Sequence, residues 1–199
     1  EDLCAISRLR ADSILEAAGG DRGTMAAVSA DGERVAELIE GIDGVVVANR
    51  NSPRQTVVSG TTSGIGQLID MCREQDIGVR PLKVACAFHS PSIAGADTRF
   101  RQRLDNFDFK SPDIPVWHNA TARPYEDGIE SGDLRDMLAD HLTHSVMFAD
   151  QIEDMYDAGA RTFIEVGSGR ILAGMVHDTL GDRPHTMIAT DPSGKDSLS

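Results

Sequence analysis

The chain has 199 residues, of which 40% are hydrophobic and 26% are charged, and its formal net charge is −13 at pH 7. This length and composition are typical of one globular domain, with or without a subdomain. The acidic balance argues against a nucleic-acid-binding surface, which needs clustered lysine and arginine side chains.

Cysteine content and hydropathy exclude further classes of protein. Cys4, Cys72 and Cys86 are an odd number without metal-ligand spacing, so we expect neither a disulfide framework nor a metal site. The sequence shows no signal peptide and no apolar run of membrane length. We therefore expect a cytoplasmic protein that contacts no membrane.

The first half of the chain predicts one helix followed by two β-α-β units. Residues 1–18 form the helix, which the Gly19-Gly20 pair ends. Asp31 is the cap of the next helix, and an Asn-Ser-Pro turn joins the two middle strands as a hairpin. The expected elements are strand 25–28, helix 31–39, strands 45–48 and 55–59, helix 63–75 and strand 79–84. This β-α-β-β-α-β order is the ferredoxin-like pattern.

The second half alternates helices with short strands. We expect helices over residues 94–106, 134–144, 146–158 and 170–180, and strands over 115–119 and 162–166. Ser145 is a candidate cap for the third of these helices. Residues 191–199 consist mainly of Asp, Pro, Ser, Gly and Lys, which is typical of the start of a linker.

A histidine at the end of strand 79–84 is the first candidate for catalysis. It stands in the run Val84-Ala85-Cys86-Ala87-Phe88-His89-Ser90-Pro91-Ser92-Ile93. Strand ends are held rigidly yet lie exposed, and imidazole suits proton transfer near neutral pH. A lone histidine in such a place is more often structural than catalytic, so the neighbouring sequence decides.

Four segments form a recognisable pattern along the chain. They are Leu9-Arg10 with Gly23-Thr24-Met25-Ala26-Ala27-Val28, the run Asn49-Arg50-Asn51-Ser52-Pro53-Arg54-Gln55-Thr56-Val57-Val58-Ser59-Gly60, the Ala-Phe-His-Ser-Pro run, and Phe163-Ile164-Glu165-Val166-Gly167-Ser168-Gly169. In order and spacing they resemble malonyl-type acyltransferase domains of polyketide and fatty acid synthases. The resemblance runs from about residue 1 to about residue 180.

The resemblance implies an α/β fold with two parts. An α/β-hydrolase-like large subdomain carries an inserted ferredoxin-like βαββαβ small subdomain. Residues 1–22 would be a helix of the large subdomain, 23–86 the small subdomain, 87–190 the rest of the large subdomain, and 191–199 a linker-like tail.

The nucleophile of the resembled family has no counterpart in this sequence. That serine stands in a G-H-S-x-G elbow. The serines in Gly60-Thr61-Thr62-Ser63-Gly64 and Gly167-Ser168-Gly169 lack the pattern. We expect the chain to be the C-terminal part of a catalytic domain, inactive alone, with an upstream segment supplying the serine.

His89 matches the histidine of the resembled family, which takes the proton of the serine as the serine attacks an acyl-coenzyme A thioester. A backbone carbonyl orients the second ring nitrogen. Ser145-Val146-Met147-Phe148 matches the family segment that supplies this carbonyl, which assigns it to Met147. The acyl group then passes to the phosphopantetheine thiol of an acyl carrier protein.

Arg10 matches the arginine that pairs with the free carboxylate of malonyl. A guanidinium offers a planar bidentate fork and stays charged when it is desolvated. The alternative is an ordinary salt bridge with Asp2 or Glu16 on the helix face, since such pairs are common and weak.

Phe88 matches the residue whose ring contacts the α-carbon of malonyl. Its bulk leaves no room for a methyl branch, so we expect malonyl to be preferred over methylmalonyl. Cys86 stands where the family's tetrad has histidine and is a further substrate-binding candidate. The alternative for Phe88 is a core aromatic.

Polar and basic residues outside the tetrad complete the set. Asn49 and Asn51 are candidates for the wall of a pantetheine groove, although Asn-x-x-Pro chemistry suits a turn equally well. Any dock for an acidic carrier protein needs a local basic patch, for which the candidates are Arg99, Arg101 and Arg103. The alternative for these three is a solvated helix face.

The expected function is transfer of malonyl from malonyl-coenzyme A to an acyl carrier protein in a type I polyketide synthase. Neighbouring synthase domains are further expected partners, and no permanently bound cofactor is expected. One alternative is a non-catalytic scaffold of the same fold that binds a carrier protein or neighbouring domain. Another is a hydrolase of this fold that clears stalled acyl groups, and Arg10 argues against it.

Overall fold

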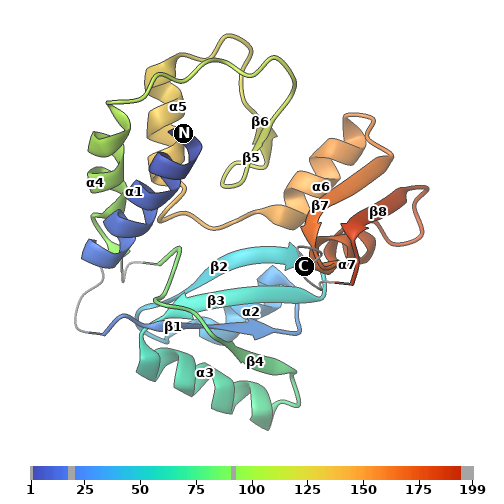
Figure 1. The fold of residues 1–199 in the computed structure, drawn as a ribbon. Helices are drawn as coiled ribbons and strands as arrows, with labels where there is room; N and C mark the ends of the chain where they lie inside the picture. Colours follow the sequence, from blue (N-terminus) through green and yellow to red (C-terminus); the bar gives the residue numbers. More distant parts are fainter. Residues whose placement is uncertain (1, 18–20, 91–92, 194–199) are drawn as a thin grey trace.

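The computed structural model describes residues 2–17, 21–90 and 93–193. Its elements in chain order are α1 (Asp2–Ala17), β1 (Thr24–Val28), α2 (Gly32–Ile39), β2 (Val45–Ser52), β3 (Gln55–Gly60), α3 (Thr62–Glu74), β4 (Val79–Leu82), α4 (Ala96–Leu104), β5 (Trp117–His118), β6 (Arg123–Pro124), α5 (Ser131–Asp140), α6 (Phe148–Asp157), β7 (Thr162–Ser168), α7 (Ile171–Leu180) and β8 (Thr186–Asp191). Figure 1 shows a central sheet, a group of helices above it, and a smaller α/β unit at one side.

The central sheet is antiparallel and has the strand order β2-β3-β1-β4. Ala26 of β1 pairs with Val58 of β3 on one side and with Pro81 of β4 on the other. Helices α2 and α3 cover one face, where Val35 and Leu68 pack against Ala26 and Val58 in one buried cluster. The predicted β-α-β-β-α-β order and the hairpin are confirmed.

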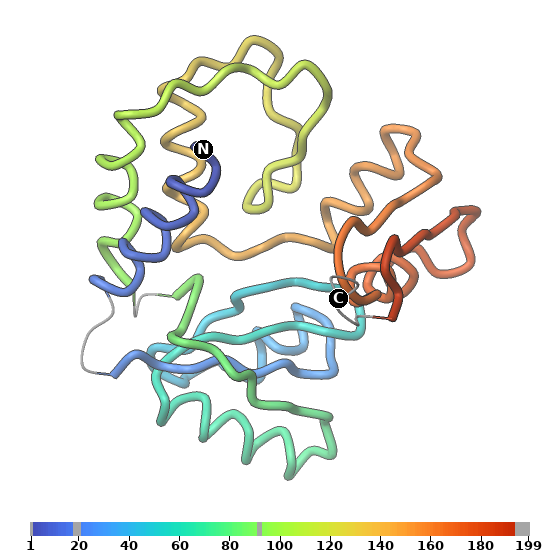
Figure 2. Tube along the Cα trace, viewed as in Figure 1, coloured from blue at the N-terminus to red at the C-terminus, as the bar shows by residue number. Residues whose placement is uncertain are grey.

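The opposite face of the sheet is also buried. Met25, Ala27 and Val57 form a second cluster there, and Phe88 packs against it. Figure 2 shows the chain after β4, in green, crossing this face toward the helices. Because both faces of β1 are covered, its sequence is a continuous apolar run rather than an alternating one.

Helices α1, α4 and α5 form the layer above the sheet. Their shared cluster includes Ile14, Phe100 and Leu142, each at most 3% exposed. The Arg103 guanidinium of α4 donates to both carboxylate oxygens of Glu16 on α1, at 2.9 Å each. The chain segment that carries His89 leads from β4 in the sheet to α4 in this layer.

The lateral unit contains the parallel strands β7 and β8, which pair directly and are connected along the chain by α7. Phe163 packs against Val176 and Leu180 on the covered face. On β7 and β8, Ile164, Val166 and Ile188 are 58%, 85% and 45% exposed. The described residues therefore leave one apolar face of this pair uncovered. This is unusual, because parallel sheets are normally buried on both faces.

The structure differs from the sequence prediction at several boundaries. β6 and β8 were not predicted, and α6 begins at Phe148 with Met147 as its N-cap. Ser145 is therefore not the cap, because its hydroxyl donates to the carbonyl of Val47 instead. Of the predicted tail, Asp191 ends β8 and residues 194–199 lie outside the described part. The division at residues 22–23, 86–87 and 190–191 stays a prediction.

Glu165 caps α7 from a distance, which gives the first prediction. Its carboxylate accepts from the backbone N–H groups of Leu172 and Ala173, at 3.2 and 2.8 Å. A carboxylate that satisfies two free donors at a helix N-terminus stabilises it. We expect Glu165→Ala to lower the free energy of unfolding in urea by about 1 kcal/mol.

Glu130 offers the matched control, because it is the N-cap residue of α5 yet makes no side-chain cap hydrogen bond. Glu130→Ala should change the free energy of unfolding by less than about 0.5 kcal/mol. Equal losses in the two variants would contradict the capping role of Glu165.

Candidate active site

His89 lies in a turn beyond β4 rather than at a strand end. Among the described residues β4 is an edge strand that pairs with β1 alone, and its last residue, Leu82, stands opposite Met25. The ladder between β1 and β4 ends at this pair, one residue after the start of β1 at Thr24. The predicted strand 79–84 is too long for this reason, and the segment from residue 83 onward leaves the sheet.

The segment before His89 is tied to the start of β1. The N–H of Ala87 donates to the carbonyl of Arg22 at 2.8 Å. A Cβ on Gly23 would lie 2.3 Å from the Gly60 carbonyl oxygen and 2.6 Å from the Cβ of Ala87. Only glycine permits this approach at φ +64°, so Gly23 sets how closely the His89 segment sits on the sheet.

The backbone of His89 is in the left-handed region, at φ +57°. This conformation costs a non-glycine residue about 1 kcal/mol, and local hydrogen bonds offset the cost. The hydroxyl of the buried Ser90 donates to the carbonyl of Ala87 at 2.7 Å. The tight turn directs the imidazole away from the sheet toward the end of α5.

The His89 ring is oriented by two backbone carbonyls that follow α5. Its Nδ1 lies 2.8 Å from the oxygen of His144 and 3.1 Å from that of His141. Carbonyls only accept, so the neutral ring carries its proton on Nδ1 and leaves Nε2 as a bare acceptor. That is the tautomer a general base requires.

Met147 does not supply the orienting carbonyl, which corrects the sequence-based assignment. As the N-cap of α6, its carbonyl accepts from the N–H of Gln151 at 2.9 Å. The helix start thus uses the group that was predicted to meet His89. The prediction placed the orienting residue in the right segment but three residues too late.

The chain from His144 to Met147 is pinned to the sheet. Val146 donates to the carbonyl of Ala48 and accepts from the N–H of Arg50, each at 2.8 Å. This bridge runs parallel to β2, as Figure 2 shows for the tan segment that passes along it. The carbonyl of His144 is therefore fixed relative to the same sheet that carries the His89 segment.

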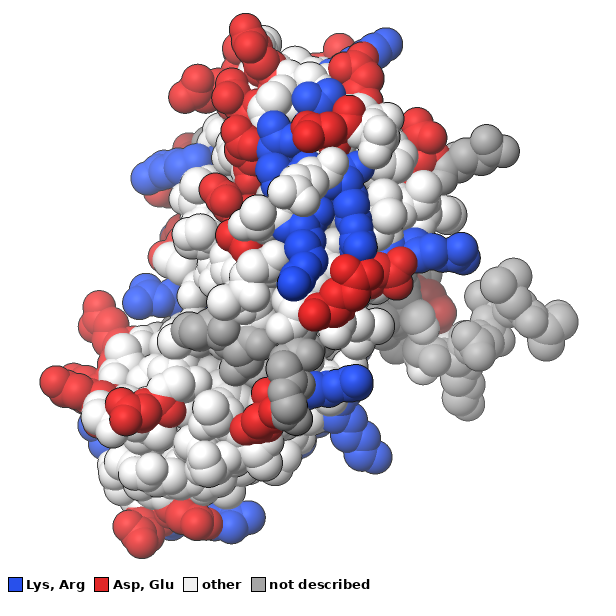
Figure 3. All heavy atoms as spheres, turned by 90° about the vertical axis from the view of Figure 1, so that its left-hand side faces the viewer, with Lys and Arg blue, Asp and Glu red and all other residues white. Residues whose placement is uncertain are grey.

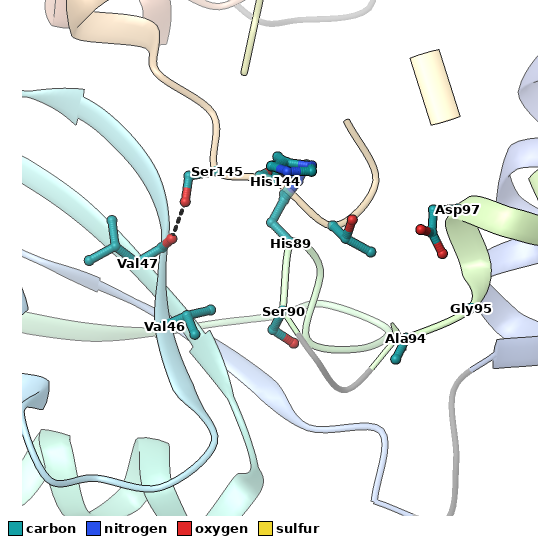
Figure 4. A pocket seen from close by; sticks show the side chains of 10 residues that line it. Val46, Val47, His89, Ser90, Ala94, Gly95, Asp97, His144 and Ser145 are labelled. Atoms are coloured by element: carbon teal, nitrogen blue, oxygen red, sulfur yellow. Dashed lines mark hydrogen bonds between the residues drawn. The ribbon is translucent and has the colours of Figure 1, made fainter. Parts of the chain in front are cut away.

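A cavity of about 420 Å³ opens beside His89. Figure 4 shows Ser145 bonded to Val47 on one side and Asp97 of α4 on the other. The lining residues come from β2, the His89 turn, the start of α4 and the segment after α5: Val46, Val47, His89, Ser90, Ala94, Gly95, Asp97, Thr143, His144 and Ser145. Asp97 and Thr143 were not singled out from the sequence.

Arg10 is a half-buried cation on α1 that makes no hydrogen bond or ion pair with any described residue. Glu16, one of its two expected partners, binds Arg103 instead, and Asp2 forms no ion pair with it. Burial lowers the pKa of Arg10, although a guanidinium still stays charged. A desolvated charge without a counter-ion is a candidate anion-binding group.

The environment of His89 favours its neutral form. Burial lowers the pKa of His89, the carbonyl of His144 partly opposes this, and the charge of Arg10 lowers it further. Arg10 therefore lies within electrostatic reach of the imidazole. The structure brings these two predicted site residues into one region.

Phe88 and Cys86 differ in their placement. Phe88 is half-buried and packs against both the helical cluster and the sheet cluster. Cys86 is fully buried among Ile14, Ile93 and Phe100, and burial raises the pKa of its thiol. Cys86 therefore does not line the site, which corrects the prediction that it binds substrate.

The hairpin asparagines also separate. The side-chain N–H of Asn51 donates to the Oε1 of Gln55 at 2.9 Å, and Asn51 is 9% exposed. Its amide therefore closes the hairpin, which favours the turn role over the groove role. Asn49 is half-buried and stands opposite Val146 in the bridge to the segment after α5, so only its backbone position is tied to the site.

The arginines of α4 do not form a basic patch. Arg101 bonds to Asp105 and Asp136, and Arg103 bonds to Glu16. Figure 3, which looks onto the α1 and α4 side, shows blue and red atoms interleaved. Because Arg101 and Arg103 are paired with acids of this chain, the interpretation as a solvated helix face fits these two. Arg99 forms no ion pair within the described residues.

The described ranges hold neither a metal-binding cluster nor a membrane-spanning helix. Residues 2–17, 21–90 and 93–193 contain no group of three His, Cys, Asp or Glu side chains placed to hold a metal ion. None of the helices in those ranges is long and apolar enough to span a bilayer.

Comparison with known proteins gives a family match over nearly the whole chain. The acyl transferase domain family matches residues 5–192. The polyketide biosynthesis malonyl CoA-acyl carrier protein transacylase of Bacillus velezensis is 35% identical over 171 residues, which is 78% of this chain and 57% of that protein. The malonyl CoA-acyl carrier protein transacylase of Bacillus subtilis is 32% identical over 200 residues, covering 96% of this chain and 61% of that protein.

A solved structure agrees with these relatives. The acyltransferase domain from the second module of the salinomycin polyketide synthase superimposes with a TM-score of 0.84 at 27% identity, covering 98% of this chain and 45% of that chain. The chain thus spans about three-fifths of the length of the two transacylases and less than half of the solved domain.

The buried histidines give a prediction for stability. The pKa values of His89, His118 and His141 lie below the ordinary 6.5, and burial is the first cause in each case. The unfolded chain therefore binds more protons than the native one as pH falls below 6.5. We expect the free energy of unfolding to fall from pH 6.5 to about 4, the pKa of His141.

Urea unfolding at a series of pH values measures this effect. His141→Phe should make the acid loss shallower, because it removes one group that titrates differently in the two states. The exposed His177→Phe should leave the slope as in the unsubstituted chain. An unchanged slope in His141→Phe would contradict the assignment.

Proposed function

This chain belongs to the acyl transferase domain family, and from that membership we propose that it carries the general base and the acyl-group site of a malonyl transferase. The donor is malonyl-coenzyme A and the acceptor is the phosphopantetheine thiol of an acyl carrier protein. The setting is polyketide biosynthesis, in a type I synthase. No permanently bound cofactor takes part in this reaction.

The His89 imidazole is the observation that carries the proposal. Its Nδ1–H is held by the carbonyls of His144 and His141, which leaves Nε2 free beside a cavity of about 420 Å³. Burial and Arg10 hold its pKa below the ordinary value, so the ring is neutral at pH 7. A neutral, oriented imidazole is able to take a proton from a hydroxyl nucleophile.

The nucleophile comes from a serine in a segment outside these 199 residues. No G-H-S-x-G run occurs in the sequence. The uncovered apolar face of β7–β8, with Ile164, Val166 and Ile188 exposed, offers a surface for such a segment. The serine oxygen would attack the thioester carbonyl as Nε2 of His89 takes its proton, and the protonated ring would return that proton to the departing coenzyme A thiolate.

Arg10 binds the free carboxylate of the malonyl group. It is half-buried, charged and without an acidic partner among the described residues. A bidentate carboxylate would satisfy its donors and neutralise its charge. An acetyl group lacks this carboxylate and would leave the guanidinium unpaired.

Phe88 selects malonyl over methylmalonyl through its bulk. The ring precedes His89, and its partial exposure leaves part of it free to meet an acyl group. The contacts of Phe88 with two core clusters fix its position, so the ring cannot move aside for the methyl branch of methylmalonyl. Cys86 has no part in this selection because it is fully buried.

The partners follow from the same reaction. They are the acyl carrier protein, the segment with the serine and the neighbouring domains of the synthase. We propose no nucleic acid and no membrane among them, and a cytoplasmic location. Arg99 remains a candidate contact for the acidic carrier, since Arg101 and Arg103 are bound to acids of this chain.

Acylation of a protein extended upstream through the serine segment tests the function. Incubation with malonyl-coenzyme A followed by intact-mass measurement should show a malonyl adduct. Arg10→Ala should slow malonyl acylation roughly 10- to 100-fold because a charged bidentate contact is lost, and should not slow acetyl acylation, because acetyl has no carboxylate to pair with Arg10. His89→Ala should slow acylation with either donor by at least about 100-fold.

Arg8→Ala is the matched control, since Arg8 is an exposed arginine of the same helix. It should acylate at the unsubstituted rate. A folded, serine-containing protein that gives no adduct would favour the non-catalytic scaffold.

The specificity assigned to Phe88 has its own test. Phe88→Ser opens space beside the acyl group, so the ratio of methylmalonyl to malonyl acylation rates should rise about 10-fold or more. Phe109→Ser is the control, because Phe109 also packs against the helical cluster but stands away from the His89 turn. An equal rise in both variants would assign the effect to loosened packing.

A further inference from the structure

Two further histidine rings lie behind His89 in series. The ring of His141 is 5.2 Å from that of His89, centroid to centroid, and is tilted by 43°. The ring of His118 is 5.7 Å from that of His141 in an edge-on contact of 68°. The carbonyl of His141 orients His89, but the rings of His118 and His141 have no part in the proposed acyl transfer.

His118 is held by α5 with one nitrogen left bare. Its residue is 5% exposed in β5, and its Nε2 lies 3.1 Å from the carbonyl oxygen of Met137. Since the carbonyl accepts, Nε2 carries the proton and Nδ1 of the neutral ring is an acceptor. Within the described residues, that buried Nδ1 has no hydrogen-bond partner.

His141 presents the complementary group. Its Nε2 is also buried and has no hydrogen-bond partner among the described residues. A proton on this Nε2 is the donor that the bare Nδ1 of His118 lacks. The two rings are in edge-on contact with their centroids 5.7 Å apart, and pairing the two nitrogens would remove the cost of burying both without a partner.

We propose that His118 and His141 are a neutral pair joined by a hydrogen bond from the Nε2–H of His141 to the Nδ1 of His118, and that this pair positions the imidazole of His89. The role as a positioning residue rests on the proposed function of His89 as the base. His141 holds His89 twice, since its carbonyl meets Nδ1 at 3.1 Å and its ring lies against the imidazole. His118 in turn fixes the rotation of the His141 ring.

The charges around the pair keep it neutral. The pKa of His141 is lowered to about 4 by burial first, and then by the repulsion from Arg10 and from His89, His118 and His144 in their protonated forms. Burial also lowers the pKa of His118, which the carbonyl of Met137 and the carboxylate of Asp140 partly oppose. The ring of Tyr125, 5.5 Å from that of His118, closes the other side. Burial and the charge of Arg10 therefore keep His141 neutral at pH 7, and burial keeps His118 neutral.

Histidine-selective ¹⁵N NMR tests the pair without any need for acyl transfer. At pH 7 both rings should be neutral with the proton on Nε2, and His118→Phe should shift the Nε2 resonance of His141 by removing its acceptor. A proton on Nδ1 of His141, or a charged ring at pH 7, would overturn the pair. If the protein shows no acylation at all, this measurement still decides the inference separately from the proposed function.

Kinetics of the serine-containing protein test the positioning role. His118→Phe and His141→Phe should each lower kcat about 10-fold with KM almost unchanged, because a loosened base is misplaced without loss of substrate contacts. The double variant should lose no more than either single one, since each breaks the same hydrogen bond. Losses that multiply to about 100-fold, or losses that appear in KM instead, would overturn the role. His177→Phe serves as the control for exposed histidines.

Discussion

The hydrogen bonds from the Nδ1–H of His89 to the carbonyls after α5 are the contacts on which the rest of the site depends. They join residues 52 and 55 positions apart in the chain. For them to form, His89 must hold a left-handed backbone, and the segment after α5 must lie along β2. The first condition is met by the Ser90–Ala87 bond and the second by the Val146 bridge. Loss of either contact would displace the His89 imidazole even though His89 itself is unchanged.

These carbonyls also balance two opposing requirements on the base. A general base has to be neutral in the resting state, and burial of His89 achieves this by lowering its pKa. It must then accept a proton, which places a cation in the same half-buried position. The carbonyls after α5 lie at the negative end of that helix and bond to the ring, so they stabilise the cation when it forms. Orientation and charge stabilisation therefore come from the same two oxygen atoms.

Local features of this fold were predictable from the sequence, and long-range ones were not. Asp31 caps α2 as predicted, because a cap involves only neighbouring residues: it accepts from the N–H of Arg34 at 2.8 Å. The burial of Cys86 was missed because its cluster is built by α1, α4 and α5, which lie far apart in the sequence. The place of Cys86 in the tetrad indicates where its backbone lies but not the direction in which its side chain points.

The same distinction explains the assignments of the orienting carbonyl and of β8. The segment around Met147 was recognised by its pattern, but the exact start of α6 decides which carbonyl is free, and helix starts are the least certain part of such a prediction. In the part of the chain that the structure describes, β8 pairs with β7 alone, in parallel, so its own short sequence does not show the partner that makes it a strand. Likewise, His118 and His141 are 23 residues apart in the numbering and meet only through the fold.

Arg10 links the electrostatics of the site to substrate binding. Its charge lowers the pKa of both His89 and His141, and no described carboxylate offsets it. Under the proposed function, the carboxylate of the malonyl group would neutralise this charge. The repulsion between Arg10 and a protonated His89 would then weaken. The pKa of His89 would rise, and the ring would become a stronger base toward the proton of the serine. A substrate without the carboxylate would leave that repulsion in place. The arginine would thus favour malonyl twice, first by pairing with it and then by strengthening the base once it is bound.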